Sequence, residues 1–466
     1  MPLELITPDE APDQVPADSG LRHNILSPLE TLSQSISAIA PTTSPALTVP
    51  LIFALSGNGT WLAYLLAMLA MLLIALCIAR FARISASPGS LYKYATDSLP
   101  PIAGGAAGGA LLLAYVATGS SVVGGFINYA RVLIPAAQHI PGPLLALIVT
   151  AASTALAYRD VQTSTRLMLW IEALSVSMIT VVLAILLFRN GPHLDVPQLT
   201  LQNATPSGIR LGVVLAIFSF VGFESATTLG HEARNPLRTI PRALIQSAVL
   251  SGLFFLAGAY IETFAFRQIH TDLGTSTAPF NLLAPLAHLP FFGPLIATGT
   301  FVSMFACTLA CITAAARVLL KMAHDGLAPS PLGRTHHANE TPHLAVLTTG
   351  LAVLLPTVLL SARGVSGMDI YGWMGSLAVY GFLTIYFLVA VALPFYLRRN
   401  AMLTPAALTL SIAAALAMVL AMAGSVYPVP TQFPYNYLPY LYLAYLILGL
   451  LWFTLAHRRT ATTGKA

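Results

Sequence analysis

The sequence predicts an all-α membrane protein with about twelve transmembrane helices. Of its 466 residues, 56% are hydrophobic and only 8% are charged, whereas a soluble domain has about 25% charged residues. Apolar stretches recur along the chain, most of them close to the roughly 20 residues that a spanning helix needs. Lys and Arg gather in alternate loops, as they do on the cytoplasmic side of membranes. These three observations exclude a water-soluble fold.

Twelve apolar stretches are long enough to be spanning helices. The polar residues 1–34 come before them and lack the apolar core of a signal peptide, so we expect a cytosolic N-terminal tail. Residues 457–466 are expected to form a cytosolic C-terminal tail. The predicted spans cover about 35–55, 60–79, 102–130, 144–158, 167–188, 207–229, 243–265, 293–320, 344–360, 370–397, 405–426 and 437–456.

The placement of charge predicts the orientation. With the N-terminus in the cytoplasm, 17 of the 22 Lys and Arg residues fall on the inside. One missed or invented span would invert every later loop and remove this asymmetry. The sequence therefore predicts a multi-pass protein of the plasma (cell inner) membrane with both termini cytoplasmic. The net charge of +5 is explained by these loops and not by nucleic acid binding.

Two of the spans contain residues that interrupt a helix. Residues 40–45 read Ala-Pro-Thr-Thr-Ser-Pro, and proline removes a backbone donor and clashes with the preceding turn. In the sixth span, Gly222 relaxes the backbone next to a glutamate. These are the first helices of two possible five-helix halves, 35–188 and 207–398. Interruptions at matching places predict an inverted repeat with a substrate site at the two breaks.

The chemistry of such breaks favours a zwitterion. Half-helix N-termini present free N–H groups, which suit a carboxylate. Unwound carbonyls suit an ammonium group or a sodium ion. The alternative is that proline and glycine simply kink these two helices.

Three motifs follow one another along the chain. Residues 87–95 read Ser-Pro-Gly-Ser-Leu-Tyr-Lys-Tyr-Ala. Gly-Phe-Glu at 222–224 is followed by Glu-Ala-Arg-Asn-Pro-Leu-Arg-Thr-Ile-Pro at 232–241, and Arg317 leads to Met-Ala-His-Asp-Gly-Leu-Ala-Pro at 322–329. In order and spacing they resemble the amino acid–polyamine–organocation superfamily of permeases. The resemblance implies a LeuT-type 5+5 inverted repeat over residues 35–398, with two peripheral helices in residues 399–456.

The resemblance also implies where a substrate would bind. Backbone N–H groups of the first break would take its carboxylate, and carbonyls of the sixth span would face its amine. Phe218 matches a position where members place an aromatic ring over the substrate, although it is equally well explained as a packing residue. The predicted substrate-binding residues are Thr42, Thr43, Ser44, Phe218, Ser219, Val221 and Gly222.

Two carboxyl groups lie deep within predicted spans. A charge at mid-bilayer costs at least about 2.5–3.5 kcal/mol, so such residues are functional candidates by default. Glu224, beside the sixth-span break, is expected to couple protonation, gating or both; the alternative is a neutral acid bonded to backbone. Glu172 is either a proton carrier or a neutral structural acid. Glu262 lies near the outer end of its helix and is expected to be solvated.

The coupling ion stays open between a proton and sodium. Some proton-coupled members carry a lysine in the fifth span that replaces sodium; Ser175 stands at that position here. Thr308 either faces a cation site near the first span or bonds its own helix backbone. Cys307 and Cys311, four residues apart, are expected to pack rather than to bind a metal. We expect no cofactor.

The function predicted is ion-coupled secondary transport of an amino acid, a small molecule that crosses the lipid bilayer by alternating access. The same fold could instead carry an amine or polyamine, or exchange amino acids. A non-transporting sensor is the alternative from another class. The spans contain no catalytic motif, so no enzymatic activity and no catalytic residue are expected.

Overall fold

The computed structural model describes residues 25–463, apart from residues 86–89, 160, 190–193, 231, 337–338, 340, 428 and 430–432. The side chains at positions 90, 161–169, 171, 452 and 455–463 are also outside the description. Most of the expected N-terminal tail and the Pro88-Gly89 part of the second motif therefore lie outside the described residues.

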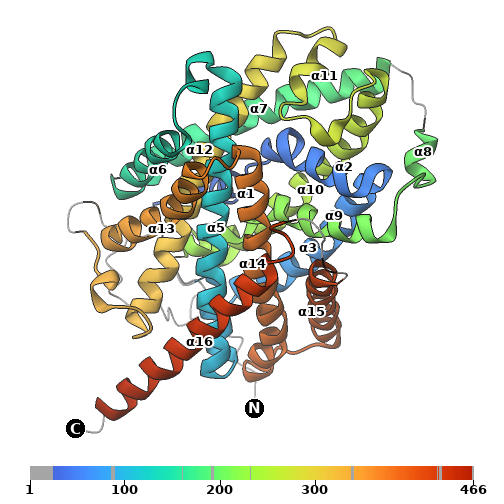
Figure 1. Ribbon diagram of the computed structural model, residues 1–466. Helices are drawn as coiled ribbons and strands as arrows, with labels where there is room; N and C mark the ends of the chain where they lie inside the picture. Colours follow the sequence, from blue (N-terminus) through green and yellow to red (C-terminus); the bar gives the residue numbers. More distant parts are fainter. Residues whose placement is uncertain are drawn as a thin grey trace.

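The described residues form helices joined by turns and loops (Figure 1). The first half of the predicted repeat contains α1 (Pro28–Ile39), η1 (Ser44–Thr48), α2 (Val49–Ser56), α3 (Thr60–Ala82), α5 (Pro101–Leu133), α6 (Gly142–Arg159) and α7 (Val161–Arg189). The second half contains α9 (Pro206–Phe220), η4 (Phe223–Leu229), α10 (Pro236–Gln268), α12 (Phe292–His324), α13 (His343–Ala362) and α14 (Gly367–Arg399).

Two long helices follow the repeat, and short ones connect its spans. The two that follow are α15 (Pro405–Val426) and α16 (Leu438–Thr463). The connecting helices are η2 (Gly57–Gly59), α4 (Ser90–Ser98), η3 (Pro135–Gln138), α8 (Val196–Leu199), η5 (Leu273–Thr275), α11 (Phe280–Leu286) and η6 (Ser330–Gly333).

The structure agrees with an all-α fold of about twelve spans. Ten segments of the described residues are long and apolar enough to cross a bilayer. One of them, Pro28–Ala82, contains two passes, because α2 ends at Ser56 and α3 begins at Thr60. The remaining pass is α16, whose apolar part is Leu438–Leu451.

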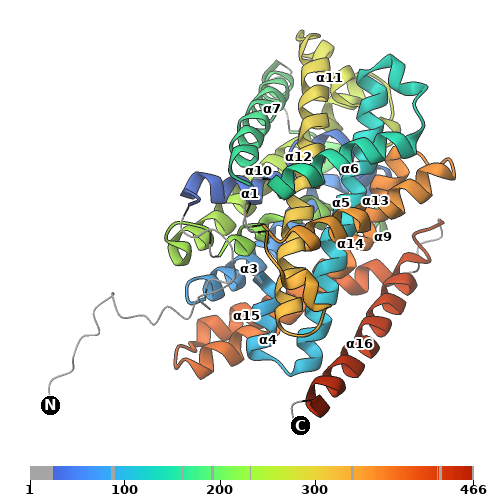
Figure 2. The ribbon, with the colours of Figure 1, turned by 90° about the vertical axis from the view of Figure 1, so that its left-hand side faces the viewer.

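Counterpart helices of the two halves lie against each other. α1 contacts η4, α3 contacts α10, α5 contacts α12, and α6 contacts α13. The long helices α5, α12 and α14 form the centre of the bundle, whereas α16 runs along its outside, as Figures 1 and 2 show. This arrangement brings α1 and η4, the two interrupted spans, together inside the protein.

The first helix begins earlier than hydropathy predicts. Residues 28–34 were expected in the tail, but α1 starts at Pro28. The Ser27 hydroxyl accepts the Glu30 N–H at 3.3 Å, and the Glu30 carboxylate accepts the Ser27 N–H at 2.7 Å. This reciprocal capping box starts a helix whatever its polarity, which is why an apolar-run criterion misses it.

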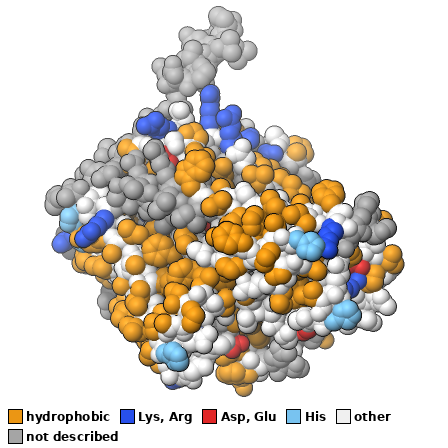
Figure 3. Space-filling model, turned by 90° about the horizontal axis from the view of Figure 1, so that it is seen from above, with side chains coloured by type: hydrophobic (Ala, Val, Ile, Leu, Met, Phe, Trp, Pro, Cys, Tyr) orange, Lys and Arg blue, Asp and Glu red, His pale blue; other side chains and the backbone are white. Residues whose placement is uncertain are grey.

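The outer surface suits a lipid environment. Figure 3 shows hydrophobic side chains over much of the face seen from above, with Lys and Arg at several places around its rim. Large apolar side chains are exposed on several spans, among them Leu69, Leu147 and Leu351. In water such a surface would aggregate; in a bilayer it contacts acyl chains.

Candidate functional site

The first span is interrupted where the sequence predicts. α1 ends at Ile39, and Ala40 takes a left-handed conformation with φ of 49°. The N–H and hydroxyl of Thr43 both donate to the Ala40 carbonyl, at 2.8 and 2.7 Å. The chain resumes as the short π-helix η1, which runs directly into α2. Residues 40–43 are thus a turn between two half-helices.

A carboxylate from another helix anchors this turn. Glu172 of α7 accepts the Thr42 N–H at 2.9 Å and the Thr42 hydroxyl at 3.1 Å, and both side chains are buried. The donors of Thr42 and Thr43 were expected to face a substrate carboxylate. In this conformation the protein uses them itself, because the unwound backbone needs internal partners at membrane depth.

Ser44 is the hydroxyl of the first break that remains available. It is completely buried, and its Oγ has no hydrogen-bond partner among the described residues. The Tyr64 hydroxyl of α3 approaches it without reaching hydrogen-bond geometry. A buried hydroxyl without a partner is unusual, so Ser44 is suited to contact a ligand.

The sixth span is interrupted by a glycine, as predicted. α9 ends at Phe220, and Gly222 has φ of 101°, a conformation that other residues rarely adopt. The chain continues as the 3₁₀ helix η4. A Cβ atom at Gly222 would lie 2.7 Å from the carbonyl carbon and oxygen of Ala38 in α1. The two interrupted spans therefore touch through backbone, with space only for glycine.

Glu224 fixes the second break. Its Oε2 accepts the Gly222 N–H at 3.2 Å and the Tyr386 hydroxyl of α14 at 2.7 Å. Its other oxygen has no hydrogen-bond partner among the described residues, although the Tyr115 hydroxyl of α5 lies nearby. The carboxyl thus connects the broken span to α14, at the centre of the bundle.

Tyrosines contact Ser219 and Phe218, two of the remaining predicted residues. The Ser219 hydroxyl lies 3.0 Å from the Tyr64 hydroxyl. The Phe218 ring stands edge-on to Tyr371 of α14, with centroids 5.6 Å apart, and Tyr371 also bonds the Thr48 hydroxyl of η1 at 2.8 Å. The N–H of Val221 donates to the Phe218 carbonyl at 3.2 Å.

Sequence reasoning missed these tyrosines. Tyr64, Tyr371 and Tyr386 each lie in an apolar span with no motif around them. The available signal was a polar hydroxyl within a stretch that must satisfy its hydrogen bonds internally. That signal indicates that a tyrosine hydroxyl must form a hydrogen bond, but it does not predict which residue is the partner.

The residues considered for a cation site lie on α12 or against it. Ser175 of α7 packs against Gly299 of α12, where a Cβ atom would lie 1.9 Å from the Ser175 Oγ. The Thr308 hydroxyl donates to the Met304 carbonyl of its own helix at 2.8 Å. Cys307 donates its thiol to the Ala38 carbonyl at 3.1 Å. Within the described part of the chain, no group of His, Cys, Asp and Glu is placed to hold a metal ion.

Glu262 corrects an expectation from the sequence. It was expected to be solvated near the outer end of its helix, but its side chain is 0% exposed. Among the described residues neither carboxyl oxygen has a hydrogen-bond partner. Neighbouring helices cover α10 at Glu262, so position along the helix did not predict exposure.

The motif residues Glu232 and Arg317 form a buried ion pair. The Arg317 Nε and Nη2 atoms donate to the two Glu232 carboxylate oxygens, each at 2.8 Å. The Glu232 carbonyl also accepts the N–H groups of Ile25 and Leu26, at 2.9 and 2.8 Å. This cluster ties the segment before α1, the loop after η4 and the C-terminal part of α12 together.

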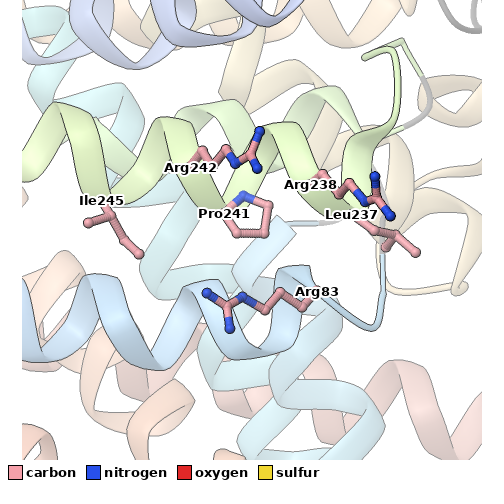
Figure 4. A pocket seen from close by; sticks show the side chains of 6 residues that line it. All are labelled: Arg83, Leu237, Arg238, Pro241, Arg242 and Ile245. Carbon is pink, nitrogen blue, oxygen red and sulfur yellow. The ribbon is translucent and has the colours of Figure 1, made fainter.

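A basic pocket of about 460 Å³ lies between the end of α3 and the start of α10 (Figure 4). Arg83 comes from one side, and Arg238 and Arg242 come from the other. It shares none of the residues of the two breaks. We do not regard it as the substrate site.

Two interrupted, touching spans within a twelve-span helical bundle define a membrane transport protein of the inverted-repeat class. The family model for amino acid permeases matches residues 31–461. The chain belongs to the amino acid permease family.

Three curated relatives are transporters of different small molecules. A methylthioribose transporter of Bacillus subtilis is 23% identical over 72% of this chain and 73% of its own length. A branched-chain amino acid permease of the same organism is 24% identical, covering 62% of this chain and 65% of the relative. A low-affinity putrescine importer of Escherichia coli is 27% identical, covering 63% and 66%. Two of these matches thus span just under two thirds of the relative.

Proposed function

We propose that the protein is a secondary transporter that carries an amino acid across the plasma membrane by alternating access, coupled to a proton or sodium ion. The observation that carries this proposal is the contact between the two broken spans at Gly222 and Ala38. A site built on two half-helices can change its access when one pair of spans rocks against the rest. Spans one, two, six and seven would move, and α15 and α16 would stay peripheral.

The substrate would lie against the two breaks. Thr42, Thr43 and Ser44 would surround its carboxylate, with Ser44 supplying the donor that the protein leaves unpaired. Ser219, Val221 and Gly222 would face its amine through backbone carbonyls. Phe218, held by Tyr371, would cover its side chain. No catalytic group is required, since no bond of the substrate changes.

Glu172 and Glu224 would act as gating residues. Each links a break to a helix outside the moving spans: Glu172 from α7 to Thr42, and Glu224 from η4 to Tyr386 of α14. Breaking or remaking these hydrogen bonds is a small, discrete change that could accompany alternation. Ser175 and Thr308 would contribute to a cation site only if sodium is the coupling ion.

The proposed orientation has both termini in the cytoplasm. The basic pocket of Arg83, Arg238 and Arg242 and the Arg317–Glu232 pair lie at the ends of spans that the charge pattern assigns to the inside. Cytoplasmic loops attract Lys and Arg.

An amine or polyamine is the second candidate substrate. It is favoured by the burial of Glu172, Glu224 and Glu262 and by the likeness to a putrescine importer. An amino acid is favoured by the Ser44 hydroxyl of the first break, which has no partner among the described residues and can donate to a carboxylate.

A thermal-shift screen of detergent-purified protein against the common amino acids and several polyamines tests the proposal. A ligand at about 100 times its Kd adds about 2.7 kcal/mol of stability. Stabilisation by amino acids, followed by uptake of the same compound into proteoliposomes, would support it. Stabilisation by diamines alone would favour the second candidate. Binding without any exchange of labelled ligand would favour a sensor.

A further inference from the structure

Glu262 is a buried carboxyl that the proposed binding site does not use. It lies in α10, less than two helical turns before the helix ends at Gln268. Glu172 and Glu224 each accept hydrogen bonds from two donors. Glu262 is just as deeply buried and, among the described residues, accepts none. Glu172 and Glu224 therefore have donors that stabilise a negative charge, whereas Glu262 has none among the described residues.

The carboxyl of Glu262 lies beside the first break. The position that a Cβ atom would take at Gly258 is 3.5 Å from Glu262 Oε1, 3.5 Å from Pro45 Cγ and 3.9 Å from Leu183 Cδ1. η1 and α7 therefore both border the same part of α10 as Glu262. Because η1 belongs to a span proposed to move and α7 does not, Glu262 lies where relative motion would occur.

Among the described residues, the titratable side chains that interact electrostatically with Glu262 are both tyrosines. They are Tyr64 of α3 and Tyr129 of α5. Tyr64 bonds Ser219, and the Tyr129 hydroxyl donates to the Ala46 carbonyl at 3.3 Å, so neither is bonded to Glu262.

No described Lys, Arg or His side chain pairs with Glu262. Arg267, further out on the same helix, is engaged with Asp195 at 2.6 Å. A carboxylate enclosed without a donor or a cation is strongly unfavourable, whereas the neutral acid is far less so. The packing seen here therefore favours a protonated Glu262.

We propose that Glu262 is the proton-binding site of the transporter, and that the helices around it close only over the protonated acid. A proton from water on the outer side would bind a carboxylate oxygen while α10 and α7 are apart. Closure would bury the neutral acid, and opening to the inside would return the proton to water there. One proton crosses in each cycle and no bond of the substrate changes. This inference rests on the proposed transport function.

The test compares Glu262→Gln, which resembles the neutral acid, with the wild type and with Thr263→Val in proteoliposomes. The probes are a radiolabelled amino acid mixture and, separately, radiolabelled putrescine. Counterflow without a gradient measures substrate exchange. Accumulation under an imposed pH gradient of about one unit, inside alkaline, can reach about tenfold for a neutral substrate coupled to one proton.

We expect Glu262→Gln to behave differently in the accumulation assay and in the counterflow assay. Glu262→Gln should lose accumulation, with a ratio near one, while its counterflow stays within about twofold of the wild type because the neutral state still closes. Thr263→Val should keep both. If Glu262→Gln fails to fold, Glu262→Met replaces it, since an apolar chain leaves no unpaired polar atom.

If Glu262→Gln accumulates substrate to the same ratio as the wild type, the inference is overturned and the proposed transport function is unaffected. Accumulation in the wild type that follows a sodium gradient and ignores the pH gradient would do the same. If the wild type shows no counterflow with either probe, the proposed transport function fails, and this inference fails with it.

Discussion

The two broken spans satisfy their backbone in different ways. At the first break, the Thr42 N–H is bonded to Glu172, a residue 130 positions away on α7. At the second, the Gly222 N–H is bonded to Glu224, two residues along the same chain. The first break therefore depends on another helix for its shape. The second depends on its own sequence and on close packing against α1, so the two should respond differently to substitution.

The largest effect is expected at Gly222. A side chain there must adopt a positive φ, which costs about 1–3 kcal/mol, and must displace the Ala38 backbone 2.7 Å away. We expect Gly222→Leu to abolish uptake into proteoliposomes while the protein still inserts and elutes as a single species. Gly449→Leu in α16, where nothing lies within 4 Å of the added Cβ, is the matched control. Normal transport by Gly222→Leu would show that the substrate site lies elsewhere.

The next effect concerns the partner of the first break. Glu172→Leu leaves the Thr42 N–H and hydroxyl without an acceptor, and each buried unsatisfied group costs about 1–3 kcal/mol. Glu172→Gln keeps an oxygen for both donors and should cost less than about 1 kcal/mol. Thermal unfolding in detergent should show a clearly lower Tm for the leucine variant only. Equal Tm values for the two variants would mean that Glu172 does not anchor this turn.

The difference between the breaks also explains what could be predicted from sequence. The spans and both interruptions were predictable, because hydropathy, prolines 41 and 45 and Gly222 are local signals. Glu224 was found for the same reason, since it adjoins its break. That Glu172 bonds Thr42 was not predictable, because nothing local links two residues on different helices.

Burial near a helix end was equally beyond sequence reasoning. Glu262 was expected in solvent because it is close to the end of its span, yet neighbouring helices cover it completely. In the same way, α1 starts at Pro28 through a capping box that hydropathy does not register. Local patterns indicate where a helix can form, whereas enclosure depends on contacts between distant segments.

A smaller effect is expected when Glu224 loses the hydrogen bond from Tyr386. Tyr386→Phe removes the hydroxyl that donates to Oε2 at 2.7 Å, a loss of about 1 kcal/mol. The Gly222 N–H still bonds the same oxygen, so the break should persist and transport should be reduced but present. Tyr440→Phe removes a hydroxyl from a side chain that is 59% exposed on α16, and should leave both Tm and uptake unchanged. If both variants behave alike, the Tyr386 hydrogen bond is not needed.

The smallest effect on stability is expected within the first break, where two neighbouring hydroxyls differ. Thr43 donates to the Ala40 carbonyl at 2.7 Å, whereas Ser44 has no partner among the described residues. Thr43→Val should therefore lower stability by about 1 kcal/mol, and Ser44→Ala should change it by no more than about 0.5 kcal/mol. Ligand affinity should show the reverse order, because a lost hydrogen bond of about 1 kcal/mol weakens binding about fivefold. Ligand titrations monitored by thermal shift measure both quantities in one experiment. Unchanged affinity in Ser44→Ala would remove Ser44 from the binding site.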